Sequence, residues 1–295
     1  MVKINLKNKN WQWGTLILLS FLWGSSFILM KRGLESYSQY QVAALRIFIS
    51  FLAFLPLIVK NIAKINKNNI KPLIIIGVIG TAIPAFMFTK AQTKIDSSIA
   101  GILNSLAPLF TLIIGLLFYK SKAKLLNILG ILLGLVGAMG LILKDSINLE
   151  LGNTNNLYGF YIVIATICYG INANHVKYKI PDLSGLEITS LAFLFIGPPA
   201  GIYLLFTDFS NVIASENYIQ NLIFIGMLAV FSSVFALSIF NTLIKYSTAL
   251  FATSVTYIIP IIAILWGLFD GEIFHLSNII WLTFIFGGVY LVNKQ

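Results

Sequence analysis

The chain has few of the residue types that build catalytic and metal centres. Its 295 residues include one cysteine, Cys168, two histidines and ten acidic residues. A single cysteine leaves neither a disulfide framework nor a thiolate metal cluster. Two histidines without clustered acids leave no acid–base, nucleophile or metal constellation. The sequence therefore argues against an enzyme and predicts no cofactor.

Charge is also scarce. Only 10% of the residues are charged and 58% are hydrophobic, with a mean hydropathy of +0.89, whereas soluble domains are about 25% charged. The composition predicts an integral membrane protein whose surroundings are a lipid bilayer. The net charge of +10 does not indicate nucleic-acid binding, because the basic residues lie in short links between apolar runs, where they report topology.

The apolar runs predict an all-α polytopic membrane protein with ten transmembrane helices and short links. Each run is long enough, or nearly so, to cross a bilayer. The predicted spans are residues 11–31, 40–59, 72–90, 97–118, 125–143, 157–178, 186–206, 219–244, 249–269 and 276–292.

The two halves of the chain resemble each other. Residues 251–269 can be laid over residues 99–117, so that Asn104 meets Thr256 and Pro108 meets Pro260. Internal repeats in membrane proteins are typical of transporters, in which paired bundles face a shared site. We therefore predict two five-helix repeats, residues 1–148 and 149–295.

The basic residues predict the orientation. With the N-terminus in the cytoplasm, fourteen of the twenty basic residues lie inside, five lie outside and Arg46 lies within a span, as the positive-inside rule requires. Ten spans place both termini in the cytoplasm. Because each half has an odd number of spans, the two repeats must be inverted relative to each other.

Several motifs resemble the EamA-type branch of the drug/metabolite transporter superfamily. They are WGSSF at residues 23–27, Arg46 followed by small and apolar residues, and Gly271-Glu272 after the ninth span. In the first half Tyr119-Lys120 stands where the family has its Gly-Glu pair. The resemblance covers nearly the whole chain and implies a carrier of small metabolites, often amino acids exported from the cytoplasm, in a bacterial-type inner membrane.

Polar residues three and four positions apart form stripes on several spans, and such a stripe can line a cavity. The alternative is that these side chains only join helices or bond to their own backbone. The candidate substrate-binding residues from these stripes are Trp23, Ser26, Asn104, Tyr169, Asn172, His175, Asn241, Thr256 and Tyr257.

Arg46 is a further candidate. It lies about 9 Å into its span by helical rise, where an unpaired guanidinium is costly unless it snorkels to the interface. It either binds a substrate carboxylate or anchors its helix to neighbouring carbonyl groups. His175 is either a proton carrier or a hydrogen-bonded interior histidine. Lys31 and Lys177 lie at helix ends, where we expect them at the interface.

Glycine and proline positions suggest moving and fixed parts. Pro84, Pro108 and Pro260 are predicted in helix interiors, and Pro198 and Pro199 in the seventh span, where each would bend the helix and act as a hinge or as a static kink. Glycines 130, 134 and 137 share a helix face, typical of close helix packing. We expect that face in the scaffold or in a homodimer contact.

These features together predict a secondary transporter that exports a small polar or zwitterionic, amino-acid-like metabolite by alternating access. The acidic residues all lie outside the middles of the spans, so we expect downhill transport or exchange rather than proton coupling. A multi-span channel and a membrane-embedded enzyme are the alternatives. The sequence has no charged ring or carbonyl-filter motif of a channel.

Overall fold

The computed structural model describes residues 6–120, 124–143 and 155–293, and all regular elements in these ranges are helices. The predicted boundary between the halves, at residues 148–149, lies outside these ranges. So do Lys3, Lys122, Lys144 and Lys294, which contributed to the predicted orientation.

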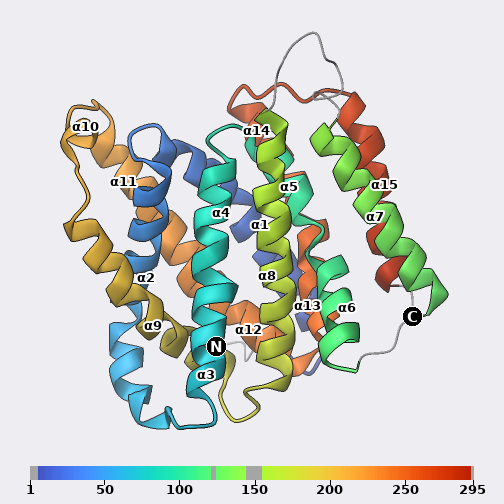
Figure 1. Ribbon diagram of the computed structural model, residues 1–295, viewed down its shortest axis with the longest axis horizontal. Coiled ribbons are helices and arrows are strands. Elements are labelled where there is room, and N and C mark those ends of the chain that lie inside the picture. Colours follow the sequence, from blue (N-terminus) through green and yellow to red (C-terminus); the bar gives the residue numbers. More distant parts are fainter. Residues whose placement is uncertain (1–5, 121–123, 144–154, 294–295) are drawn as a thin grey trace.

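The helices form one bundle in which most axes run along a common direction (Figure 1). The first part of the chain contains α1 (Lys9–Leu34), α2 (Gln39–Asn61), η1 (Ile62–Lys64), α3 (Ile70–Gly77), η2 (Val78–Ala82), α4 (Ile83–Ala91), α5 (Ser97–Asn104), α6 (Ala107–Phe118) and α7 (Leu125–Leu143). The second part contains η3 (Asn155–Tyr158), α8 (Gly159–Tyr178), α9 (Gly185–Leu205), α10 (Ser210–Ile213), α11 (Tyr218–Met227), η4 (Leu228–Ala236), α12 (Leu237–Tyr246), α13 (Ala249–Thr253), η5 (Ser254–Tyr257), α14 (Ile259–Phe269) and α15 (Ser277–Asn293).

In the described ranges, eight helical segments are long and apolar enough to cross a bilayer, and each matches a predicted span. The other two predicted spans correspond to α8 and α15. α15 has 17 residues, slightly short for a crossing, and the last turns of α8 carry Asn172, Asn174, His175 and Lys177. The all-helical membrane fold is confirmed, while the count of ten spans remains a prediction.

Apolar side chains cover the outside of the bundle. Val59, Leu205 and Phe206 expose 72%, 83% and 87% of their surface, which in water would be an aggregation hazard. Hydrocarbon surroundings remove that cost, so the exposed surface agrees with an integral membrane protein.

The second and seventh predicted spans begin in the same way. Ser38 accepts a hydrogen bond from the N–H of Gln41, whose side chain accepts one from the N–H of Ser38. Ser184 and Glu187 form the same reciprocal pair at the start of α9. Each capping box satisfies two N–H groups that a helix start leaves free.

Several spans that contribute to the cavity described below have irregular backbones. The third and eighth contain the π-helical segments η2 and η4. The fourth changes from α5 to α6 after Asn104, and the ninth passes from α13 through the 3₁₀ segment η5 to α14. π-helical turns are frequent at functional sites, because they turn side chains away from the regular helical face.

These irregularities correct the predicted positions of two prolines. Pro108 and Pro260 lie in the first turns of α6 and α14, not in helix interiors. A proline in the first turn sacrifices no helical hydrogen bond, so each begins a new segment after a break. Pro84 follows η2 within the continuous helical span Ile70–Ala91, so its interior position is as predicted. Pro198 and Pro199 do lie inside α9, as predicted.

The glycine face of α7 packs within the chain. α7 and α15 lie side by side at one edge of the bundle (Figure 1). A Cβ on Gly130 would lie 2.4 Å from the carbonyl oxygen of Gly288, and one on Gly137 would lie 2.8 Å from the backbone nitrogen of Ile285. The face therefore has the scaffold role that was one of the two predictions for it.

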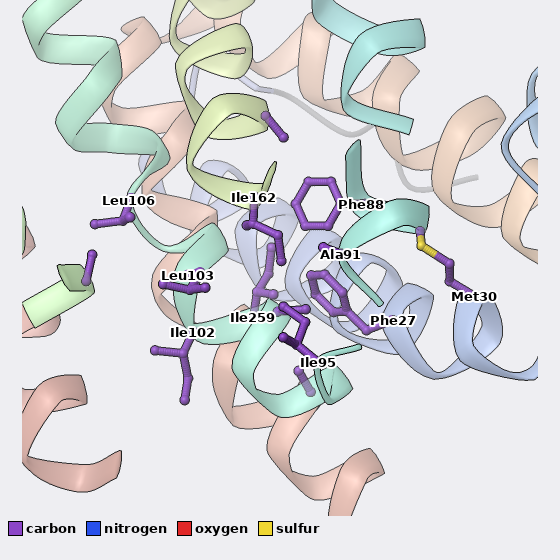
Figure 2. Close-up of a cluster of buried hydrophobic side chains, with 14 of the residues drawn as sticks. Phe27, Met30, Phe88, Ala91, Ile95, Ile102, Leu103, Leu106, Ile162 and Ile259 are labelled. Carbon is purple, nitrogen blue, oxygen red and sulfur yellow. The ribbon is translucent and has the colours of Figure 1, made fainter. Parts of the chain in front are cut away.

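A cluster of buried apolar side chains packs between several helices. It joins α1, α4, α5 and α14 through Phe27, Phe88, Ile102 and Ile259 (Figure 2). The rings of Phe27 and Phe88 lie 5.8 Å apart. These side chains hold the four helices together next to the cavity described below.

Candidate functional site

A cavity lies among α1, α2, η2, α5, α8, η4 and the α13–η5 segment. It brings together side chains from both halves of the sequence. Seven of the ten predicted binding residues line it: Trp23, Ser26, Arg46, Asn104, Tyr169, Asn172 and Thr256.

Arg46 gives the cavity a positive wall. Its Nε donates a hydrogen bond to the Ser233 hydroxyl at 2.8 Å, and its terminal NH₂ group donates one to the Ser232 hydroxyl at 3.1 Å. Both acceptors are neutral, and among the described residues no carboxylate forms an ion pair with Arg46. Because a guanidinium has five N–H donors, this arrangement leaves capacity to bind an anionic group.

Two amides extend the polar lining. Asn104 and Asn172 are buried, and the Oδ1 atom of each accepts no hydrogen bond from the described part of the chain. A buried acceptor without a donor costs about 1–3 kcal/mol. Rotation of either amide would present a carbonyl oxygen to an N–H donor of a bound molecule.

The remaining walls are largely aromatic. The indole of Trp23 donates a hydrogen bond to the Ser232 carbonyl at 3.2 Å and meets Phe240 edge to face at 5.0 Å. The Tyr169 ring stacks on Phe88 at 6.0 Å. An apolar portion of a ligand would therefore contact aromatic rings, while its charged portion would face Arg46.

Two of the predicted polar residues are already hydrogen-bonded within their own segments. Ser26 donates to the Trp23 carbonyl at 2.6 Å, and Thr256 donates to the Thr253 carbonyl at 2.9 Å. Both still line the cavity, so their oxygen lone pairs are what they offer to a ligand.

The other three predicted residues are not in the lining. His175 Nδ1 lies 2.5 Å from the Tyr119 hydroxyl, where burial raises the pKa of Tyr119. Asn241 donates to the Thr189 hydroxyl at 2.9 Å and so joins α12 to α9. Tyr257 points toward the Val289 carbonyl of α15, at 3.4 Å. These contacts join elements of the scaffold.

Sequence reasoning missed Ser232 and Ser233. From the eighth span the predicted binding residue was Asn241, which was chosen on a regular helical period. The π-helical turn of η4 shifts that period and directs the two serines to Arg46. Two adjacent hydroxyls in an otherwise apolar run were the available signal.

Gly80 of η2 makes room for one of the amides. A Cβ at this position would lie 2.3 Å from Asn172 Oδ1.

The residues that the structure describes contain no group of three or more His, Cys, Asp or Glu side chains that could hold a metal ion. The cavity is suited to binding a small molecule through hydrogen bonds and one positive charge.

Comparisons with known proteins agree on the class. The EamA-like transporter family model matches residues 12–143 and again residues 156–294. An uncharacterized inner membrane transporter of Escherichia coli, YedA, is 27% identical over 284 residues, covering 92% of this chain and 86% of that protein. An uncharacterized transporter of Archaeoglobus fulgidus is 22% identical over 287 residues, covering 96% and 99%.

A solved crystal structure shares the fold. It aligns with a TM-score of 0.62 at 14% identity and covers 95% of each chain. The family model accounts for nearly all of the sequence, and both relatives are named as transporters, the Escherichia coli protein as an inner membrane transporter. The chain is an integral membrane protein and belongs to the EamA-like transporter family.

Proposed function

We propose that the protein is a secondary transporter that exports a small zwitterionic, amino-acid-like metabolite by alternating access of the central cavity. The observation that carries this proposal is Arg46, a cation on the cavity wall that, among the residues the structure describes, is hydrogen-bonded only to neutral serine hydroxyls. A substrate carboxylate would supply the charge-assisted partner. The Oδ1 atoms of Asn104 and Asn172 would accept hydrogen bonds from the N–H groups of the substrate's ammonium end.

The proposed architecture is a pair of inverted five-helix repeats with both termini in the cytoplasm. The equivalent capping boxes of α2 and α9 support it, as do the π-helical segments of the third and eighth spans and the breaks in the fourth and ninth. Irregular backbone at matching places in two halves is how many transporters build a central site.

The test is thermal stabilisation of the purified protein by a panel of amino acids and their analogues. Each amino acid is compared with the amine that lacks its carboxylate and the acid that lacks its ammonium group. A ligand at about one hundred times its Kd stabilises the folded state by about 2.7 kcal/mol. We expect the intact amino acids to raise Tm most and Arg46→Ala to remove the effect.

Ser50→Ala is the matched control for Arg46→Ala. Ser50 lies one turn further along α2 and donates to the carbonyls of Arg46 and Ala229. It therefore tests damage to the packing of α2 on η4 without removing the charge. If both variants lose the ligand response equally, or if no compound in the panel raises Tm, the proposed function is wrong.

A further inference from the structure

Charged side chains meet at one end of the cavity-forming helices. Lys31 Nζ, at the end of α1, lies 2.7 Å from Asp270 Oδ2 and 3.0 Å from Glu272 Oε1. Arg32 contacts Asp270 and also Glu35, the latter at 2.7 Å. The side chains of Asp270 and Glu272 are only 7% and 2% exposed. Two nearly buried carboxylates thus tie the loop after α14 to α1.

Glu272 also caps a helix of the other half of the chain. Its Oε1 accepts the backbone N–H of Ser97 at 3.0 Å, and its Oε2 accepts that of Ser98 at 3.1 Å. Asp96, the residue at the N-cap position of α5, makes no such bond. A carboxylate at a helix N-terminus is stabilised by the free N–H groups and by the helix dipole. One side chain therefore joins α1, α5 and the α14 loop.

Two glycines allow Glu272 to fold back in this way. Gly271 has a φ of +84°, a backbone conformation that residues with a side chain rarely adopt. A Cβ on Gly267 would lie 2.3 Å from Glu272 Oε2. The backbone is thus shaped to place this carboxylate at the start of α5.

The cluster lies next to the cavity. Met30 lines the cavity and directly precedes Lys31, and α5 runs from Ser97 to the cavity residue Asn104. Phe27 and Phe88, which also line the cavity, belong to the same buried cluster as Ile95, which precedes Asp96 and Ser97 in the chain (Figure 2). This apolar cluster therefore links the cavity lining to the start of α5, which Glu272 caps.

The opposite end is joined by different contacts. Lys177, which overlays Lys31 in the sequence repeat, contacts the backbone carbonyls of Ile244, Lys245 and Ser247. Within the described residues no acidic side chain forms an ion pair with Lys177.

An ion pair between the two halves does occur at this end, between Lys64 of η1 and Glu187 of α9. Its side chains are 49% and 19% exposed, against 32% and 2% for Lys31 and Glu272. The two ends therefore differ in how deeply their ion pairs are buried.

We propose that the bonds from Glu272 to Lys31, Ser97 and Ser98, here called the Glu272 latch, are the outer gate of the transport pathway. This inference rests on the proposed function and its orientation, which places the end of α1 outside. Opening the cavity to the outside requires the carboxylate to leave α5, so the latch favours the outward-closed state. The ion pair at the inner end, Lys64–Glu187, is more exposed and therefore weaker, so the inner end opens more readily.

Cysteine accessibility tests the latch without any substrate. In a Cys168→Ser background, a single cysteine replaces Ser26 in the cavity, and a membrane-impermeant thiol reagent is added to spheroplasts or to inverted vesicles. Hydrogen bonds to charged groups are each strong enough to shift an equilibrium about tenfold. We expect Glu272→Gln to speed labelling from outside by about that factor and to slow it from inside.

Glu35→Gln is the matched control, because Glu35 pairs with Arg32 within one helix end and, in the described part of the chain, forms no ion pair with a second element. It should leave both labelling rates unchanged. Equal rates for Glu272→Gln and its parent from both faces would overturn the proposal, and so would equal acceleration by both variants. Failure of the proposed function would appear separately, as absent ligand stabilisation in a protein whose labelling still responds to Glu272→Gln.

A second variant covers the case in which Glu272→Gln does not fold. Lys31→Met, in the same Cys168→Ser background, removes the ion pair with Glu272 and leaves Glu272 bonded to the N–H groups of Ser97 and Ser98. We expect Lys31→Met to speed labelling of the cavity cysteine from outside. An outside labelling rate equal to that of the parent contradicts the proposal.

Discussion

Arg46 donates a hydrogen bond from Nε to the Ser233 hydroxyl at 2.8 Å, and this contact joins α2 to the π-helical segment η4 across the cavity wall. Together with the bond from the terminal NH₂ group to the Ser232 hydroxyl, it fixes the orientation of the guanidinium. The remaining N–H donors can then bind a ligand. A residue from each half of the chain therefore sets the position of the charge on which the proposed substrate site depends.

Ser233→Ala should weaken binding of carboxylate-bearing ligands by about fivefold, because losing about 1 kcal/mol of a hydrogen bond changes affinity by roughly that factor. Neutral ligands should bind as before. Ser238→Ala is the control, since Ser238 Oγ is buried in the same span without a hydrogen-bond partner among the described residues. Calorimetric titration measures both variants, and equal effects on charged and neutral ligands would contradict a role in orienting Arg46.

Gly80→Ala should distort the cavity, because the new Cβ would lie 2.3 Å from Asn172 Oδ1. We expect a loss of about 1–3 kcal/mol of stability, as for other overpacked interiors, and a weaker ligand response. Gly226→Ala in α11 has no atom within 4 Å of the new Cβ, so it should be neutral or slightly stabilising. Thermal unfolding compares the two variants. Equal Tm values would show that the Asn172 side chain moves aside without a loss of stability.

Glu272→Gln should lower the free energy of unfolding by about 3 kcal/mol, the usual cost of breaking a buried ion pair. Glu35→Gln should change it by less than about 1 kcal/mol, because that pair is exposed. Denaturant or thermal unfolding in detergent tests both. Equal stability of Glu272→Gln and the parent would mean that Asp270 alone holds Lys31.

The stability should also fall in acid. Burial opposes ionisation of Glu272, but hydrogen bonds from Lys31 and from the N–H groups of Ser97 and Ser98 outweigh it and hold its pKa below the usual value. Its stabilisation is complete above the ordinary glutamate pKa of about 4.3 and disappears as the pH falls through the lower pKa of the folded state. Glu272→Gln should lack this fall in Tm.

Asp96 acts in the opposite direction. Burial and the nearby charge of Glu272 raise the pKa of Asp96, so its protonation favours the folded state as the pH falls toward that raised pKa. Asp96→Asn removes this compensation and should make the acid loss of Tm steeper. If Tm falls less steeply with acid in Asp96→Asn than in the parent, protonation of Asp96 destabilises the folded state and this account of Asp96 is wrong.

His175→Ala should leave ligand affinity and its pH dependence within about twofold of the parent, because His175 contacts Tyr119 outside the cavity lining. Such a change is under about 0.5 kcal/mol. Transport measured with and without a pH gradient is the check. A variant that loses all response to the gradient would identify His175 as a proton carrier.

The sequence predicted the parts of the fold that depend on hydrophobicity. Long apolar runs identified the membrane spans, and Arg46 with Asn104, Tyr169 and Asn172 formed a set that the structure gathers in one cavity. A charged or amide group among apolar residues is costly, so its position is a strong signal even without coordinates.

Backbone irregularity accounts for much of what the sequence did not predict. η2 and η4 change which side chains face the cavity, so a regular helical period selected Asn241 and missed Ser232 and Ser233. The breaks before Pro108 and Pro260 moved these prolines from helix interiors to helix starts. The bond from Glu272 to α5 joins residues far apart in the chain, so no pattern of neighbouring residues predicts it.

The most direct test of the account is counterflow in proteoliposomes, using the amino acid that raises Tm most. We predict that unlabelled amino acid inside the vesicles accelerates uptake of the labelled compound by the parent protein, and that Arg46→Ala abolishes this acceleration while Ser50→Ala retains it. Uptake that ignores the inside concentration would indicate a channel, and full counterflow by Arg46→Ala would contradict the binding of the substrate by Arg46.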